Sequence, residues 1–183
     1  AAQAILARTF TMKKIQEGGV KAHGTDASTS VEEFQAYNPA RVNDNVRRAV
    51  EMTRGQVIKY KGNYINAWFH ASGGSQTAAS AIEGLNFRRE TAPYIKSVAD
   101  PGQGITTAEN RSWTAGFSTA EVAAAVRKVT GQDPGPITAV SIAARGPSGR
   151  ATQLRIGNLT VDAPALRLAL GSDRLRSTLI KSV

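Results

Sequence analysis

The sequence predicts an α+β fold in which helices are mixed with antiparallel hairpins. Apolar residues recur at helical spacing, with capping signals, in several separate stretches of the 183-residue chain. Turn-forming residues separate two pairs of short strand-like stretches, which is typical of hairpins. Strands and helices do not alternate regularly, which argues against a parallel sheet. The length fits a single domain over residues 1–183, with a possible small subdomain at residues 20–40.

An alanine-rich helix is predicted at the start of the chain, over residues 1–15. Gly18 and Gly19 end it. No Ser, Thr, Asp or Pro stands ahead of Ala1 to cap the helix, so we expect it to begin upstream and the chain to be truncated at its N-terminus. A signal or membrane anchor would lie in that missing part.

Residues 20–40 are rich in small polar residues and predict irregular backbone. His23 with Asp26, Glu32 and Glu33 raises the question of a metal site. One imidazole among carboxylates without fixed spacing is more typical of a solvated loop, and the chain has no Cys. We therefore expect no metal and no other cofactor.

A capped helix and a hairpin are predicted next. The helix covers residues 43–53 and ends before Gly55. Two strands, over residues 56–60 and 64–69, flank a turn at residues 61–63.

The second half predicts a longer helix, a second hairpin and a short helix. Ser118 and Glu121 form a capping box for a helix that runs to about Thr130. The remaining expected elements are a short helix or loop at 77–85, a strand at 93–98, a hairpin of strands 137–145 and 150–157, a helix capped by Asp162 and ending at Gly171, and a last strand at 177–183. In the hairpin, Val140, Ile142, Leu154 and Ile156 are expected to face the core.

The chain is strongly basic, with 23 Lys and Arg against 14 Asp and Glu and a net charge of +9. Such a surface attracts polyanions: nucleic acid, anionic lipid or an anionic cell wall. Paired arginines such as Arg47–Arg48 and Arg88–Arg89 are scattered and match no nucleic-acid motif. We expect no nucleic-acid partner, and only the charge keeps that class open. No apolar run approaches the ~20 residues that span a bilayer.

The candidate site is residues 68–77, where the predicted strand breaks into Gly73 and Gly74. Paired glycines serve either a left-handed turn or a close approach of backbone to a ligand. The polar side chains around them suit a hydroxyl-rich or anionic ligand, although a plain strand-to-helix turn explains the same glycines. These side chains are His70, Ser72, Gln76 and Thr77. A serine hydrolase is disfavoured, since His70 and Ser72 have no evident acid partner and G-x-S-x-G is absent.

The ordered set of short motifs resembles the stage II sporulation protein D (SpoIID/LytB) family. Residues 2–10 (AQAILARTF) resemble its A-Q-A-x-A-A-R-T-Y helix, and residues 60–77 resemble its Y-x-G-x-x-I-x-A-x-Y-H-x-x-S-G-G-x-T stretch with one extra residue. Further pieces are Gln35-Ala36-Tyr37, residues 49–55, residues 93–101, Trp113, Ser148-Gly149-Arg150, Leu166-Arg167 and Leu170-Gly171.

This resemblance implies a peptidoglycan lytic transglycosylase that acts outside the cytoplasmic membrane during sporulation. It implies that glycan strands are the partner, with an amidase that removes stem peptides as a possible second partner and a membrane contact only through a missing N-terminal anchor. The substrate-binding residues that it implies are Gln3, Arg8, Gln35, Tyr37, His70, Ser72, Gly73, Gly74 and Thr77.

Two departures from the family pattern matter. The catalytic glutamate of the family would fall about three residues before Ala1, one helical turn upstream, so no catalytic residue is expected in this chain. Some members bind zinc through Cys and His in the loop, but the equivalents near Glu33 and Phe34 are not such ligands. The other carboxylates, among them Glu83 and Glu90, are expected in polar, loop-like surroundings that do not favour a general acid. A non-catalytic wall-binding module that stimulates another hydrolase is the alternative.

Overall fold

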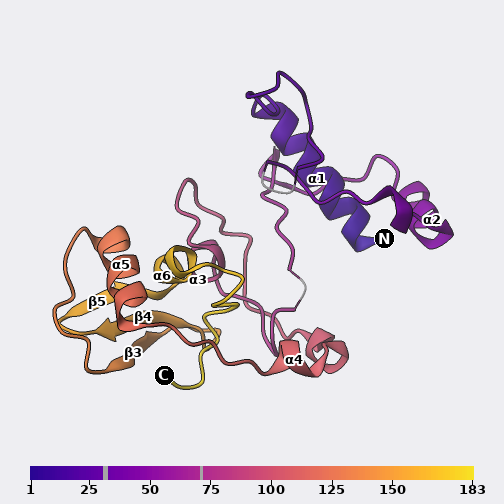
Figure 1. Ribbon diagram of the computed structural model, residues 1–183. Coiled ribbons are helices and arrows are strands. Elements are labelled where there is room, and N and C mark those ends of the chain that lie inside the picture. Colours follow the sequence, from indigo (N-terminus) through magenta and orange to yellow (C-terminus); the bar gives the residue numbers. More distant parts are fainter. Residues whose placement is uncertain (31–32, 71) are drawn as a thin grey trace. The chain divides into compact units, whose positions relative to one another are not determined.

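A computed structural model describes residues 1–30, 33–70 and 72–183, so Glu32, one of the carboxylates considered for a metal site, lies outside the described residues. The α+β class is confirmed: the described residues contain six α-helices and two small antiparallel sheets. They divide into two compact units, residues 1–70 and 71–183 (Figure 1). The single domain over residues 1–183 stays a prediction.

The first unit contains both helices that the sequence predicts there. Asn43 caps the second helix, because its side chain accepts a hydrogen bond from Val46 N at 3.1 Å. Thr9 is fully buried, and its hydroxyl accepts a hydrogen bond from Ile58 N at 2.9 Å. The elements are α1 (Ala2–Gln16), η1 (Pro39–Arg41), α2 (Asp44–Met52), β1 (Lys59–Tyr60) and β2 (Asn63–Tyr64).

The first hairpin is present but much shorter than predicted. Lys61 and Gly62 both have positive φ, 48° and 83°, as a two-residue type I′ turn requires. Lys59 lies opposite Tyr64 in the ladder. The predicted strand over residues 64–69 is wrong beyond Tyr64. Within the described chain the sheet has only the strands β1 and β2, and such a two-stranded hairpin without further partners stays short.

The second unit holds the longer helix and the second hairpin where the sequence predicts them. The capping box is formed: Glu121 N donates to Ser118 Oγ at 3.2 Å and Ser118 N donates to Glu121 Oε2 at 2.8 Å. Asp162 caps the last helix through Ala165 N at 2.9 Å. The elements are α3 (Ala81–Leu85), η2 (Pro101–Ile105), α4 (Ala108–Arg111), α5 (Thr119–Thr130), β3 (Val140–Arg145), β4 (Ala151–Ile156), β5 (Leu159–Asp162) and α6 (Ala163–Leu170).

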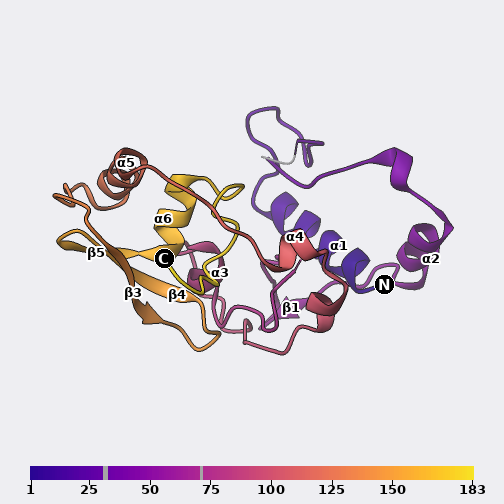
Figure 2. The same ribbon diagram turned by 60° about the horizontal axis from the view of Figure 1, so that its bottom comes forward.

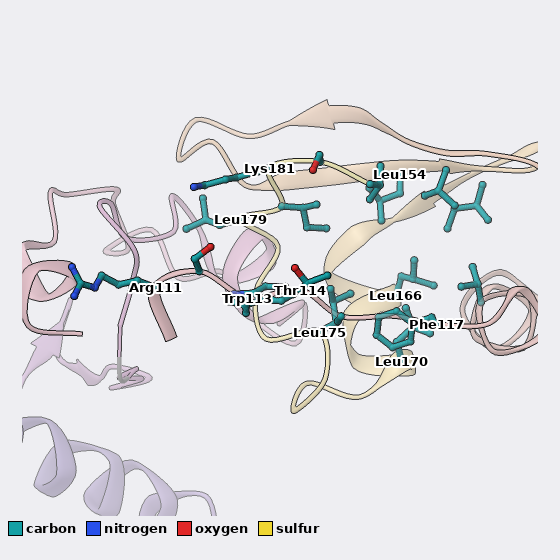
Figure 3. A pocket seen from close by; sticks show the side chains of 18 residues that line it. Arg111, Trp113, Thr114, Phe117, Leu154, Leu166, Leu170, Leu175, Leu179 and Lys181 are labelled. Atoms are coloured by element: carbon teal, nitrogen blue, oxygen red, sulfur yellow. The ribbon is translucent and has the colours of Figure 1, made fainter. Parts of the chain in front are cut away.

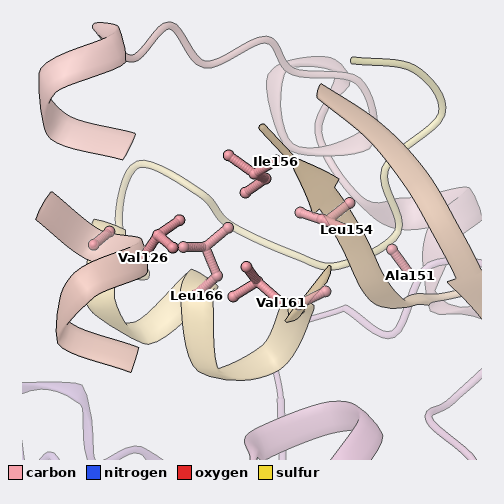
Figure 4. Packing of buried hydrophobic residues seen from close by; sticks show 8 residues of the cluster. Val126, Ala151, Leu154, Ile156, Val161 and Leu166 are labelled. Carbon is pink, nitrogen blue, oxygen red and sulfur yellow. The ribbon is translucent and has the colours of Figure 1, made fainter. Parts of the chain in front are cut away.

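The core of the second unit lies between a three-stranded antiparallel sheet and two helices. The strand order is β3-β4-β5, and α5 and α6 lie together beside the sheet (Figure 2). Leu154 and Ile156 of β4 are 3% and 1% exposed, so their predicted inward position is confirmed. Val126 of α5 and Leu166 of α6 pack in the same cluster (Figure 4).

Two predicted strands are wrong and one strand was missed. Residues 93–98 and 177–183 form no strand; near them the structure has only an isolated bridge between Gln76 and Ala99 and single bonds such as Ala151 N to Thr178 O at 2.8 Å. Of their apolar residues, Ile180 packs against the core cluster, whereas Val98 is 58% exposed. The missed strand, β5, follows a tight turn at Gly157, whose φ is 55°.

Candidate functional site

The residues 72–77 loop is built around a left-handed turn at Gly74, whose φ is 75°. Gly73 N donates to Asp100 Oδ2 at 2.8 Å, and Gly74 N donates to Ser72 Oγ at 3.3 Å. The left-handed turn that the sequence suggested for the glycines is therefore present at Gly74. Thr77 Oγ1 accepts from Val98 N at 3.0 Å, so this hydroxyl also supports the loop.

The sequence also suggested that the glycines allow the backbone to come close to a ligand. In the structure, the group that comes close to Gly74 is a side chain of the same unit. A Cβ atom on Gly74 would lie 2.6 Å from Leu179 Cδ1. The positive φ favours glycine, and any Cβ would also have to displace the end of the Leu179 side chain, so the fold alone accounts for Gly74.

A buried arginine holds the carbonyl groups of the loop. Arg150 is 7% exposed, and its guanidinium donates to Gly73 O at 2.7 Å, to Gln76 O at 3.0 Å and to Ser148 Oγ at 2.9 Å. Burial lowers the pKa of Arg150, and the charge of Glu83 acts in the opposite direction. These bonds fix the loop from within the unit, and Gly73 itself is buried.

Glu83 completes this network, and its expected position in polar, loop-like surroundings is wrong. It is only 4% exposed. Its Oε1 accepts from Ser148 Oγ at 2.8 Å and its Oε2 accepts from Ala79 N at 2.5 Å. Ser80 caps α3 through Glu83 N, and a Cβ on Gly146 would collide with Glu83 Oε1. The S-x-x-E pattern at Ser80 could have predicted the helix start, but not the burial.

Two predicted binding residues of the first unit form internal hydrogen bonds. The Arg8 guanidinium donates to Thr53 O at 2.6 Å and to two more carbonyl groups at the C-terminal end of α2. Gln35 Nε2 donates to Ala7 O and to Thr11 Oγ1, both at 3.2 Å. Arg8 therefore joins α1 to α2, and Gln35 attaches the following loop to α1.

The remaining predicted residues of this unit have exposed side chains. Tyr37 is 64% exposed, and Gln3 and His70 are also exposed. The structure thus brings together Ser72, Gly73, Gly74 and Thr77 in the second unit, while Gln3, Arg8, Gln35, Tyr37 and His70 belong to the first. A glycan site formed by all nine stays a prediction.

A cavity of about 650 Å³ in the second unit was not predicted. It lies between the sheet, α6, the segment before α5 and the C-terminal segment (Figure 3). Leu179, which covers Gly74, also lines this cavity. Trp113, Phe117, Leu154, Leu166 and Leu175 are further lining residues. The cavity depends on residues 111–183 meeting in space, so no local sequence signal marks it.

In the loop of the first unit that raised a metal site, His23 and Glu33 form an ion pair. His23 Nε2 lies 2.9 Å from Glu33 Oε1, and a hydrogen bond from Ser28 holds the pKa of Glu33 below its ordinary value, with His23 acting in the same direction. Among the described residues, no three His, Asp or Glu are grouped so that they could hold a metal ion. Nor does any helix in the described ranges have the length and apolar character to cross a membrane.

Comparison with known proteins gives three matches. Residues 1–60 match the family model of SpoIID, stage II sporulation protein, which confirms the resemblance over this stretch. The amidase enhancer of Bacillus subtilis (strain 168) is 34% identical over 108 residues, covering 57% of this chain and 14% of that protein. An uncharacterized protein of Brachyspira hyodysenteriae is 29% identical over 171 residues, covering 92% of this chain and 44% of that protein. The chain thus spans less than half the length of either relative.

Proposed function

We propose, from the match of residues 1–60 to the SpoIID family model, that this chain binds glycan strands of the bacterial cell wall outside the cytoplasmic membrane. The observation that carries the proposal is the match of residues 1–60, because this stretch contains Gln3, Arg8, Gln35 and Tyr37. The amidase enhancer, a relative whose name links it to an amidase, supports a role at the wall.

The chemistry of the exposed residues suits a sugar polymer. Tyr37 offers an aromatic face, and Gln3 and His70 offer polar groups that can bond hydroxyl and acetamido groups. In the second unit, the loop that carries Gly74 is held by the buried network and loses little conformational freedom on binding. The net charge of +9 attracts an anionic wall from a distance.

The proposed reaction of the complete site is lytic transglycosylation between N-acetylmuramic acid and N-acetylglucosamine. A carboxylic acid gives its proton to the glycosidic oxygen, and the bond from that oxygen to the muramic acid carbon breaks. The 6-hydroxyl of the same muramic acid then bonds to this carbon and returns its proton to the carboxylate, so no water is consumed. The resemblance assigns this acid to a glutamate of the family's first helix. Glu83 does not replace it, because both of its carboxylate oxygens accept hydrogen bonds within the second unit.

The second candidate is a wall-binding module that stimulates an amidase without cleaving glycan itself. The name of the Bacillus subtilis relative favours it. Both candidates require glycan binding, and they differ in whether anhydro products form.

Co-sedimentation with purified peptidoglycan tests the shared step, with the only two histidines as a matched pair. We expect His70→Ala to weaken binding several-fold, because it removes an exposed ring next to the loop. His23→Ala is the control, since His23 pairs with Glu33 in another loop. Equal binding by both variants would exclude His70 from the site, and no sedimentation of the unmodified chain would overturn the proposal. Mass spectrometry of 1,6-anhydro products then separates the enzyme from the stimulating module.

A further inference from the structure

The cavity of the second unit has an apolar interior and a basic mouth. Figure 3 shows Arg111 and Lys181 toward one end, and Phe117, Leu166 and Leu170 toward the other. None of the described residues that line the cavity has an acidic side chain. Its polarity therefore changes from cationic to hydrocarbon along its length.

The two cations at the mouth are available to a ligand. Within the part of the chain that the structure describes, the side chains of Arg111 and Lys181 make no hydrogen bond and no ion pair. By contrast, Arg174 donates to Glu121 at 2.6 Å and is thereby occupied. An anionic group could approach either cation without breaking an internal contact.

The cavity wall at Phe117 is held in place. The Arg174 guanidinium lies 4.4 Å from the centroid of the Phe117 ring, and it also donates to Gly116 O at 2.8 Å. Glu121, part of the α5 capping box, accepts a hydrogen bond from the same guanidinium at 2.6 Å. The aromatic wall is thus preformed, and binding does not have to order it.

We propose that this cavity binds an anionic amphiphile, with its hydrocarbon chain among the leucines and Phe117 and its head at Arg111 and Lys181. Protein interiors are close-packed, and apolar clefts of a few hundred Å³ with a few placed polar groups are typical ligand sites. A hydrocarbon chain gains from leaving water there, and a carboxylate or phosphate head matches the two cations. This site is distinct from the proposed glycan loop, although Leu179 touches both.

The fluorescence of Trp113 provides the readout, because this residue lines the cavity and the only other Trp, Trp68, belongs to the first unit. The full chain is titrated with dodecanoate and with dodecyl phosphate below their micellar concentrations. Dodecyl maltoside has the same tail without charge, and hexanoate has the same head with a short tail. We expect saturable changes with the two twelve-carbon anions, weaker binding of the maltoside, and no binding of hexanoate. The Trp113→Phe variant should lose the signal.

The charge at the mouth is tested by Arg111→Glu with Lys181→Glu. The double variant should bind dodecanoate about tenfold more weakly and dodecyl maltoside unchanged. Arg89→Glu with Lys128→Glu is the matched control, because these exposed cations of the same unit do not line the cavity. Binding of both dodecanoate and dodecyl phosphate would support a site for anionic head groups in general. Binding of dodecyl phosphate alone would support a lipid phosphate as the ligand. Absence of saturable binding by either, or equal losses in both double variants, would overturn the proposal.

Discussion

A Cβ atom on Gly74 would lie 2.6 Å from Leu179 Cδ1, closer than two such carbons approach in proteins. The Gly74 φ of 75° adds a second reason for glycine at this position. The contact joins the predicted glycan loop to the wall of the cavity, because Leu179 belongs to both. A substitution at Gly74 therefore changes the fold before it changes any ligand contact.

Gly74→Ala should destabilise the chain more than Gly149→Ala does. Both glycines have positive φ, 75° and 78°, so both variants lose about 1 kcal/mol to backbone strain. Only Gly74 also meets a neighbour, whereas a Cβ on Gly149 has open space. Urea denaturation of the two variants measures the difference.

Leu179→Ala supplies the control for this clash. Combined with Gly74→Ala, it should cost less than the sum of the two single changes, since the shortened side chain makes room for the new methyl group. Strict additivity would show that the contact with Leu179 does not limit position 74.

Arg150→Gln should cost about 3–5 kcal/mol of unfolding free energy, because it leaves the buried Glu83 carboxylate without the nearby positive charge. Arg88→Gln is the matched control: Arg88 pairs with Asp162 at 2.6 Å, with the two side chains 54% and 35% exposed. That partly exposed pair should contribute no more than about 1 kcal/mol. Equal losses of unfolding free energy in the two variants, measured by urea denaturation, would show that the buried network stabilises the chain no more than the pair of Arg88 and Asp162 does.

Elements with local signals could be predicted from the sequence. The capping box of Ser118 and Glu121 and the caps at Asn43 and Asp162 each lie within three residues of the groups they bond. The left-handed turn at Gly74 was also predictable, because it follows from the glycine itself.

Features that depend on distant residues could not be predicted. Glu83 and Ser148 are 65 positions apart, and no local pattern links them. Apolar alternation suggested strands at 93–98 and 177–183, but a strand also needs a neighbour, and only the fold decides where one is present. The same dependence explains why Leu179, the residue that fills the space above Gly74, could not be foreseen.

Arg8→Lys should destabilise the first unit nearly as much as Arg8→Ala. The guanidinium fork donates to Thr53 O at 2.6 Å and to Gln56 O at 2.9 Å, and a lysine cannot make this set of bonds. A loss of about 1–3 kcal/mol is expected. If Arg8 acted only through its charge on a ligand, the lysine variant would keep full stability, which thermal and urea unfolding can detect.

Glu121 should make the chain more stable at neutral than at acid pH. A hydrogen bond from Arg174, followed by bonds from Ser118, lowers its pKa from 4.5 to about 2. Because the folded pKa is depressed, the stabilisation is present above pH 4.5 and is lost as pH falls toward 2. The stability advantage over Glu121→Gln should therefore shrink across this window. Arg174→Gln should flatten the same pH dependence, and an unchanged slope in that variant would contradict the assignment to this pair.

Salt should weaken binding to peptidoglycan much more than binding to neutral chitooligosaccharide. Long-range attraction by the +9 charge is screened beyond about 10 Å at 0.1 M salt and beyond about 3 Å at 1 M. Hydrogen bonds and stacking on an uncharged sugar are not screened in this way. Replacing Arg47 and Arg48, both exposed on α2, by Gln should reduce wall binding at low salt and leave chitooligosaccharide binding unchanged. Equal salt sensitivity for both ligands would place the positive charges within the glycan site itself.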